Sequence, residues 1–265
     1  MWHAALKFAY SGKEFNGSQR QPGVRTAEGE IIKGLMKIEA IDSPTSSRFR
    51  VASRTDRGVS ALCNVVCFDT DFSRDRLLHA LNAVCDGVYF HSIAEVPEVF
   101  SPRRAKERWY RYHLDADGID VLRFTECADL FIGKHDFKRF CKPEGKSTLK
   151  TVNEIKVTQA GGLIVIDLYA REFLRNMVRR TVAAMEKVGR GDATVDQVRR
   201  ALEGEDASFG LADPEGLFLM EIRYDVEFVR DSTEPLLRRS RERRRGALLD
   251  LFFYDSLSPD LDDGA

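Results

Sequence analysis

The order of strand-like and helix-like segments is the feature that most constrains how this chain can fold. Over residues 2–96, a strand, a helix, two strands, a helix and a further strand follow one another. Residues 108–228 repeat a similar mixture without detectable sequence identity to the first half. Because the mixture does not alternate strictly, we expect an α+β fold with antiparallel sheets.

The two halves predict two similar domains that pack closely. We expect an N-terminal α+β domain over residues 1–100, a C-terminal α+β domain over 101–229 and a charged tail over 230–265. Within the tail, a short helix is predicted over residues 248–254.

The sequence predicts the first residues of two helices in these domains. Thr26 is expected to cap a helix that runs to about residue 40. A second helix is predicted over residues 173–188. A basic ridge is expected beside its apolar stripe, made of Arg171, Arg175 and Arg179. One of these arginines could reach a carboxylate, and a solvated charged face is the alternative.

Charge is distributed unevenly along the chain. The net charge is only −1, because 41 Lys and Arg oppose 42 Asp and Glu. The last twenty residues hold five Asp and no Lys or Arg, whereas residues 101–113, 171–200 and 230–245 are basic. Basic residues interleaved with aromatic ones fit a phosphate backbone with stacked bases. The charge distribution by itself is better explained by a solvated surface.

Composition excludes several classes of protein. With 43% apolar and 31% charged residues, the chain is neither mostly disordered nor a membrane protein. The N-terminus lacks the basic and apolar regions of a secretory signal, so we expect a cytoplasmic protein. The five cysteines show no zinc spacing and are expected to be reduced and buried. The sequence contains no Gly-rich phosphate loop followed by Lys and Ser or Thr, and no His-Glu-x-x-His metal motif.

A loop between two strand-like segments carries one carboxylate between two guanidinium groups. The string S-R-T-D-R-G-V-S-A spans residues 53–61 and places Asp56 between Arg54 and Arg57. Arginines this close favour the ionised form of an aspartate, which suits a nucleophile or an electrostatic stabiliser. The alternative is an ordinary turn in which Gly58 supplies an unusual φ.

A basic and aromatic string, F-S-P-R-R-A-K-E-R-W-Y-R-Y, spans residues 100–112. On a strand over residues 108–114, Tyr110 and Tyr112 share one face. A tyrosine at such a site could stack on a base while the arginines hold phosphates. Two tyrosines in a core are the alternative.

Taken in chain order, these strings resemble the TruA family of tRNA pseudouridine synthases. The Asp56 loop is similar to the family's R-T-D-x-G-V loop, and Arg57 and Ser60 are more typical of its archaeal or eukaryotic members. Further similar strings are G-S-Q-R-Q at 17–21, the 100–112 string, F-L-R-N-M-V-R at 173–179 and L-A-D-P-E-G-L-F-L at 211–219. The resemblance covers residues 4–228.

The resemblance implies a fold of two ferredoxin-like, RRM-like halves. Their strands would form one extended, mostly antiparallel sheet with a central active-site cleft. It also implies a homodimer that binds tRNA, works without a cofactor or a metal, and has no membrane partner.

The implied reaction isomerises uridine to pseudouridine in the anticodon stem-loop of tRNA, at positions 38, 39 and/or 40. Asp56 matches the nucleophile that attacks the ribose. Arg179 matches an arginine that pairs with this carboxylate. Tyr110 matches the tyrosine that stacks on the uracil, with Tyr112 as the alternative register.

Three more arginines complete the expected substrate-binding set. Arg54 matches a residue that helps to displace the flipped nucleotide, and Arg57 and Arg103 lie in matched strings. A non-catalytic RNA-binding protein is the main alternative, although a pure binder gains nothing from an aspartate that faces phosphates. A nucleosidase or glycosylase is a second alternative, and it would release free base.

Overall fold

The structure is a computed structural model that describes residues 1–231 and 233–257. It divides into two compact units that are not consecutive in sequence. The first unit contains Met1–Arg54, Asn64–Arg103 and the described residues from Val226 onward. The second contains Thr55–Cys63 and Arg104–Asp225. The loop that carries Asp56 therefore belongs to the second unit, and the expected division at residue 100 stays a prediction.

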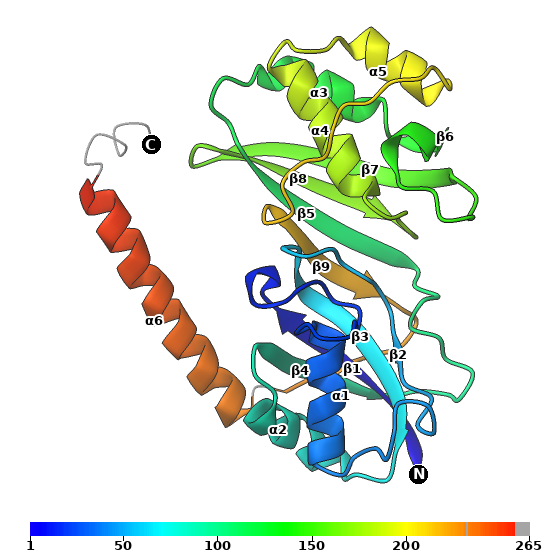
Figure 1. The fold of residues 1–265 in the computed structure, drawn as a ribbon, viewed down its shortest axis with the longest axis vertical. Coiled ribbons are helices and arrows are strands. Elements are labelled where there is room, and N and C mark those ends of the chain that lie inside the picture. The colour runs from blue at the N-terminus through cyan, green and yellow to red at the C-terminus, as the bar shows by residue number, and fades with distance from the viewer. Residues whose placement is uncertain (232, 258–265) are drawn as a thin grey trace. The chain divides into compact units, whose positions relative to one another are not determined.

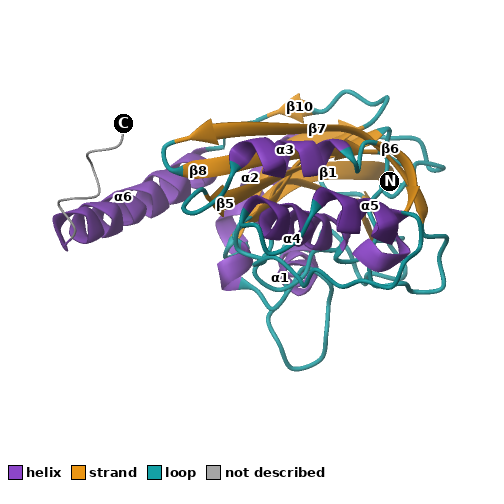
Figure 2. Cartoon of the chain, turned by 90° about the horizontal axis from the view of Figure 1, so that it is seen from above, coloured by secondary structure: helices purple, strands orange, loops and turns teal. Residues whose placement is uncertain are grey.

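The first unit holds a sheet in which the strands lie in the order β10-β4-β1-β3-β2. Its strands are β1 (Trp2–Tyr10), β2 (Arg50–Val51), β4 (Val88–Glu95), β10 (Val229–Arg230) and most of β3 (Ser60–Thr70). Its first helices are the short 3-10 helix η1 (Gly12–Glu14), α1 (Ala27–Lys37) and α2 (Arg74–Val84). In Figures 1 and 2, α1 and α2 lie on one face of this sheet. The β-α-β-β-α-β order predicted over residues 2–96 is confirmed.

In the second unit, the strands of the sheet lie in the order β9-β5-β8-β7-β6, and each neighbouring pair is antiparallel. Its strands are β5 (Glu107–Asp115), β6 (Gly133–Asp136), β7 (Leu149–Ala160), β8 (Leu163–Ala170) and β9 (Leu217–Arg223). Its helices are α3 (Val121–Asp129), η2 (Phe137–Phe140), α4 (Met177–Gly189) and α5 (Val195–Leu202).

The two units share one connection pattern. In chain order β5, α3, β7, β8, α4 and β9 correspond to β1, α1, β2, β3, α2 and β4. The sheet order β9-β5-β8-β7 likewise corresponds to β4-β1-β3-β2. Apart from the short parallel pairing of Ser60 and Ala61 with Phe218 and Leu219, the described pairings are antiparallel. The predicted α+β class with a mostly antiparallel sheet is confirmed.

Helix α1 begins as predicted and ends earlier. The Thr26 side chain accepts a hydrogen bond of 3.2 Å from the amide of Gly29, which caps the first turn. Ile31 and Leu35 are fully buried on its inner face. The helix ends at Lys37 instead of residue 40, because Glu39 takes a left-handed φ of 58° that does not continue a helix.

Helix α4 begins later than predicted. The expected start was residue 173, and the observed first residue is Met177. Asn176 has a φ of 60°, so residues 173–176 approach the helix in an irregular conformation. The basic ridge expected from Arg171 to Arg179 is therefore wrong, because Arg171 and Arg175 lie before the helix.

The tail prediction requires another correction. Residues 234–257 form one helix, α6 (Glu234–Leu257), in place of a short helix over 248–254. Leu and Arg, which favour helices, make up half of this segment. Figure 1 shows α6 beginning beside α2, and the two helices are in contact.

All five cysteines are free and buried, as predicted. Burial raises the pKa of the Cys67, Cys85 and Cys127 thiols to about 12, so they are protonated near neutral pH.

Over residues 1–231 and 233–257, no helix has both the length and the apolar character needed to cross a membrane.

Candidate active site

A tight turn presents Asp56 at the start of the second unit. The amide of Val59 donates to the Asp56 carbonyl at 3.2 Å, and Gly58 closes the turn with a φ of 88°. A Cβ at Gly58 would lie 2.8 Å from Cγ of Pro214, so only glycine fits both the backbone and the close approach. The predicted role of Gly58 in the turn is confirmed, and the same turn displays the carboxylate.

Two donors converge on one oxygen of Asp56. Arg179 Nη1 lies 3.1 Å and Asn176 Nδ2 2.5 Å from Asp56 Oδ2. The Asp56 side chain is 29% exposed and that of Arg179 is 11% exposed, so the ion pair is only partly screened by water. Both donors therefore hold the carboxylate through hydrogen bonds to the same oxygen.

Arg179 is itself held in one orientation. Its Nε donates to the Ala212 carbonyl at 2.8 Å, while its own carbonyl accepts from the Ala212 amide at 3.2 Å. The guanidinium therefore points to Asp56 from a fixed position on α4. This contact joins a helix residue to the turn that carries Asp56, 123 positions earlier in the chain.

Asn176 is a site residue that the sequence interpretation missed. It occupies the N-cap position of α4 with a left-handed backbone, and its amide reaches Asp56. Asparagine is one of the few residues with a side chain that tolerate this backbone conformation. The available signal was an asparagine, a poor helix former and a good cap, within a segment predicted as helix interior.

The other two arginines of the predicted ridge make no bond to Asp56 in the described part of the chain. Arg175 Nη1 pairs with Glu144 Oε1 at 2.8 Å, and the Arg171 carbonyl accepts from Arg108 Nη1 at 2.5 Å. Arg179 is thus the member of this predicted trio that reaches the carboxylate.

The two tyrosines of β5 share one buried face, as their alternation predicts. The Tyr112 side chain is 2% exposed, and its hydroxyl donates to the Asp213 carbonyl at 2.9 Å. Burial raises the pKa of Tyr112 to about 12. Tyr110 is 7% exposed, and its ring meets the edge of the half-exposed Phe173 ring with centroids 5.1 Å apart.

The remaining predicted arginines lie at the surface. Arg57 is exposed on the turn beside Asp56 and makes no ion pair with it in the described part of the chain. Arg54 and Arg103 are exposed residues of the first unit. The structure thus brings Asp56 together with Arg179 and the unpredicted Asn176.

Among the described residues, no group of three or more His, Cys, Asp or Glu is placed to hold a metal ion.

Comparisons with known proteins give consistent names. A family model described as tRNA pseudouridine synthase matches residues 127–225. The protein named tRNA pseudouridine synthase A from Pyrococcus abyssi is 41% identical over 91% of this chain and 92% of its own length. The protein of the same name from Thermococcus kodakarensis is 42% identical over 95% of this chain and 98% of its own length.

A relative from a different genus extends this similarity. The protein of the same name from Methanosarcina barkeri is 37% identical over 92% of this chain and 93% of its own length. These relatives are archaeal, in line with the Arg57 and Ser60 pattern. Matches of this identity and coverage include the Asp56 turn as well as α4.

Proposed function

Because the chain belongs to the tRNA pseudouridine synthase family, a family of isomerases, we propose that it isomerises uridine in the anticodon stem-loop of tRNA. The modified uridines are those at positions 38, 39 and/or 40, Asp56 is the nucleophile, and no cofactor takes part. The observation that carries this proposal is the partly exposed Asp56 carboxylate held by Arg179 and Asn176.

The arrangement of donors supports a nucleophilic role. Both hydrogen bonds go to Oδ2, and among the described residues none goes to Oδ1. Oδ1 is therefore the oxygen available to attack the ribose. Two fixed donors hold the carboxylate in one orientation, so little reorganisation precedes the attack.

The proposed reaction exchanges one bond to the ribose for another. Asp56 attacks the ribose carbon as the bond from that carbon to uracil N1 breaks. The uracil turns, its carbon 5 bonds to the sugar and the carboxylate leaves. Carbon 5 loses its proton and N1 gains one, so mass and oxidation state are unchanged.

The substrate contacts belong to the same proposal. A uridine must leave the base stack before its sugar can be attacked, and stacking on an aromatic ring offsets part of that cost. Tyr110 supplies the ring, because the Tyr112 side chain is buried more deeply, 2% exposed against 7%. The exposed Arg54, Arg57 and Arg103 contact the displaced nucleotide and the phosphates.

The proposal also includes the fold of each unit, the oligomeric state and the cellular compartment. Each unit is a ferredoxin-like half, supported by the shared sheet orders β4-β1-β3-β2 and β9-β5-β8-β7. The enzyme acts as a homodimer, as the family resemblance implies, and it works in the cytoplasm.

The proposal is tested by mapping pseudouridine on unmodified tRNA transcripts incubated with the purified protein. Carbodiimide labelling followed by primer extension should give new stops at positions 38, 39 or 40 without any added cofactor. Transcripts with cytidine at those positions are the control and should give none. Stops elsewhere would overturn the assigned positions, and release of free uracil would indicate a glycosylase.

Substitution of each tyrosine in turn shows whether Tyr110 or Tyr112 stacks on the uracil. Tyr110→Leu keeps apolar bulk and removes the aromatic face, so kcat/KM should fall about 5- to 150-fold, the range that one base–aromatic stack is worth. Tyr112→Phe is the matched control, because it removes only the hydrogen bond to Asp213. That variant should lose about 1 kcal/mol of stability and keep its activity. The opposite pattern in steady-state kinetics would assign the stacking role to Tyr112.

A further inference from the structure

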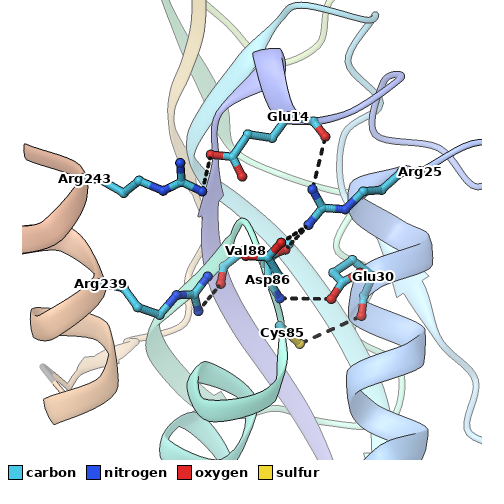
Figure 3. Close-up of polar contacts among 8 residues, drawn as sticks. All are labelled: Glu14, Arg25, Glu30, Cys85, Asp86, Val88, Arg239 and Arg243. Atoms are coloured by element: carbon cyan, nitrogen blue, oxygen red, sulfur yellow. Dashed lines mark hydrogen bonds and ion pairs between the residues drawn. The ribbon is translucent and has the colours of Figure 1, made fainter. Parts of the chain in front are cut away.

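Helix α6 is fastened to the first unit by one of its faces. Arg239 Nη1 donates to the carbonyls of Asn82 at 3.1 Å and Val88 at 3.3 Å. Figure 3 shows the contact with Val88. The same guanidinium lies 4.5 Å from the ring centroid of Tyr89. One turn further, Arg243 Nη2 pairs with Glu14 Oε1 at 3.2 Å (Figure 3). These two arginines are four residues apart and therefore lie on the same face.

The far side of the helix carries other arginines. We call Arg238, Arg241, Arg244 and Arg245 the α6 arginine row. They are all exposed, and among the described residues they make no hydrogen bond or ion pair. At 100° per residue, Arg238, Arg241 and Arg245 fall within about 60° of one another and opposite the anchoring pair.

This arrangement holds like charges together. Arginines three or four residues apart on a helix repel one another, and the exposed Glu234 and Glu242 offset only part of their charge. A polyanion that binds along the row would relieve this repulsion. Guanidinium groups also bind phosphate oxygens through two parallel hydrogen bonds.

We propose that the α6 arginine row binds the sugar–phosphate backbone of the tRNA substrate. The inference rests on the proposed function, which supplies the polyanion. It adds a binding surface at a distinct element, because α6 belongs to the first unit and the Asp56 site to the second. The row binds phosphates, so its binding is independent of sequence.

The test replaces all four arginines of the row by Gln, a good helix former, in an Asp56→Ala background that binds tRNA without turnover. Affinity for full-length tRNA should fall about tenfold or more at 0.1 M salt. The slope of log Kd against log salt should become shallower by roughly 0.7 to 0.9 for each phosphate that the row no longer neutralises. The matched control replaces the same residues by Lys, which keeps the charge and should retain most of the slope.

Kinetics in the Asp56-containing protein separate this inference from the proposed function. The Gln variant should show a raised KM for tRNA and an unchanged rate at saturating tRNA. If the unsubstituted protein formed no pseudouridine, the proposed function would fail, while the binding data would still decide the role of the row. An unchanged Kd and salt slope would overturn the inference.

Another partner for α6 is an outcome of the same experiment. Beyond the arginine row, the helix exposes seven large apolar side chains: Leu248, Leu249, Leu251, Phe252, Phe253, Tyr254 and Leu257. If the Gln variant changed the molar mass measured by light scattering and left the tRNA salt slope unaltered, the row would be part of an interface between copies of the chain. That result would contradict tRNA binding by the row.

Discussion

Asp56→Ala is expected to abolish pseudouridine formation, with a decrease of about 10⁴-fold in kcat. The reason is that the methyl group cannot attack the ribose, and no other described carboxylate accepts hydrogen bonds from Arg179 and Asn176. Asp56→Asn, which keeps the shape and a polar contact, should be equally inactive. The activity of both variants is measured in single-turnover reactions with excess enzyme, as the primer-extension stops that carbodiimide-labelled pseudouridine produces.

A second aspartate of the same unit provides the control. Asp167 accepts two hydrogen bonds of 2.8 Å from Arg111 and one of 2.5 Å from Trp109. Asp167→Asn should lower the Tm, because hydrogen bonds to a charged group contribute about 1.5–3 kcal/mol each, and it should leave catalysis in place. If Asp56→Ala retained activity while its fold and tRNA binding were intact, Asp56 would not be the nucleophile.

The second large effect is expected at Asn176. Asn176→Asp would place a second carboxylate about where the amide now lies, 2.5 Å from Asp56 Oδ2. Two carboxylates this close share a proton, because like charges favour the protonated form. The shared proton is retained to higher pH, so activity should be lost at neutral pH and should recover as the pH rises. A pH–rate profile with its acid limb displaced upward is the expected result.

Asn176→Gly is the matched variant for backbone strain. Glycine adopts a φ of 60° freely, so this change removes the amide donor and leaves the chain path intact. Removal of one hydrogen bond to a charged group predicts a fall in kcat of about 10- to 150-fold with little change in KM. Full activity of the glycine variant, together with an unshifted profile for Asn176→Asp, would reduce Asn176 to a helix cap.

Features that depend on nearby residues could be predicted from the sequence. Thr26 caps α1 through an amide three residues away, and the alternation of β5 places Tyr110 and Tyr112 on one face. Gly58 was a turn candidate because glycine permits an unusual φ and Asp56 can hydrogen-bond to its own backbone. Local propensity and side-chain period decide such features, and the printed sequence contains both.

The candidate site was predicted only in part. Asp56 and Arg179 came from motifs matched to a family, and the structure brings them within 3.1 Å. Asn176 was missed, because its helix-like context concealed the left-handed backbone that turns its amide toward Asp56. The cap preference of Asn176 is the local signal that distinguishes a helix starting at Met177 from one starting at residue 173.

By itself, the sequence determined the α+β class, the repeated strand and helix order, the family and the residue types that the chemistry requires. Tertiary structure alone decided that Thr55–Cys63 joins the second unit and that Gly58 packs on Pro214. It also decided that Arg239 and Arg243 fasten α6 to the first unit. The partners in these contacts are at least 151 positions apart in the chain. Side-chain shape and charge select such contacts only after the strands have paired and brought the partners together.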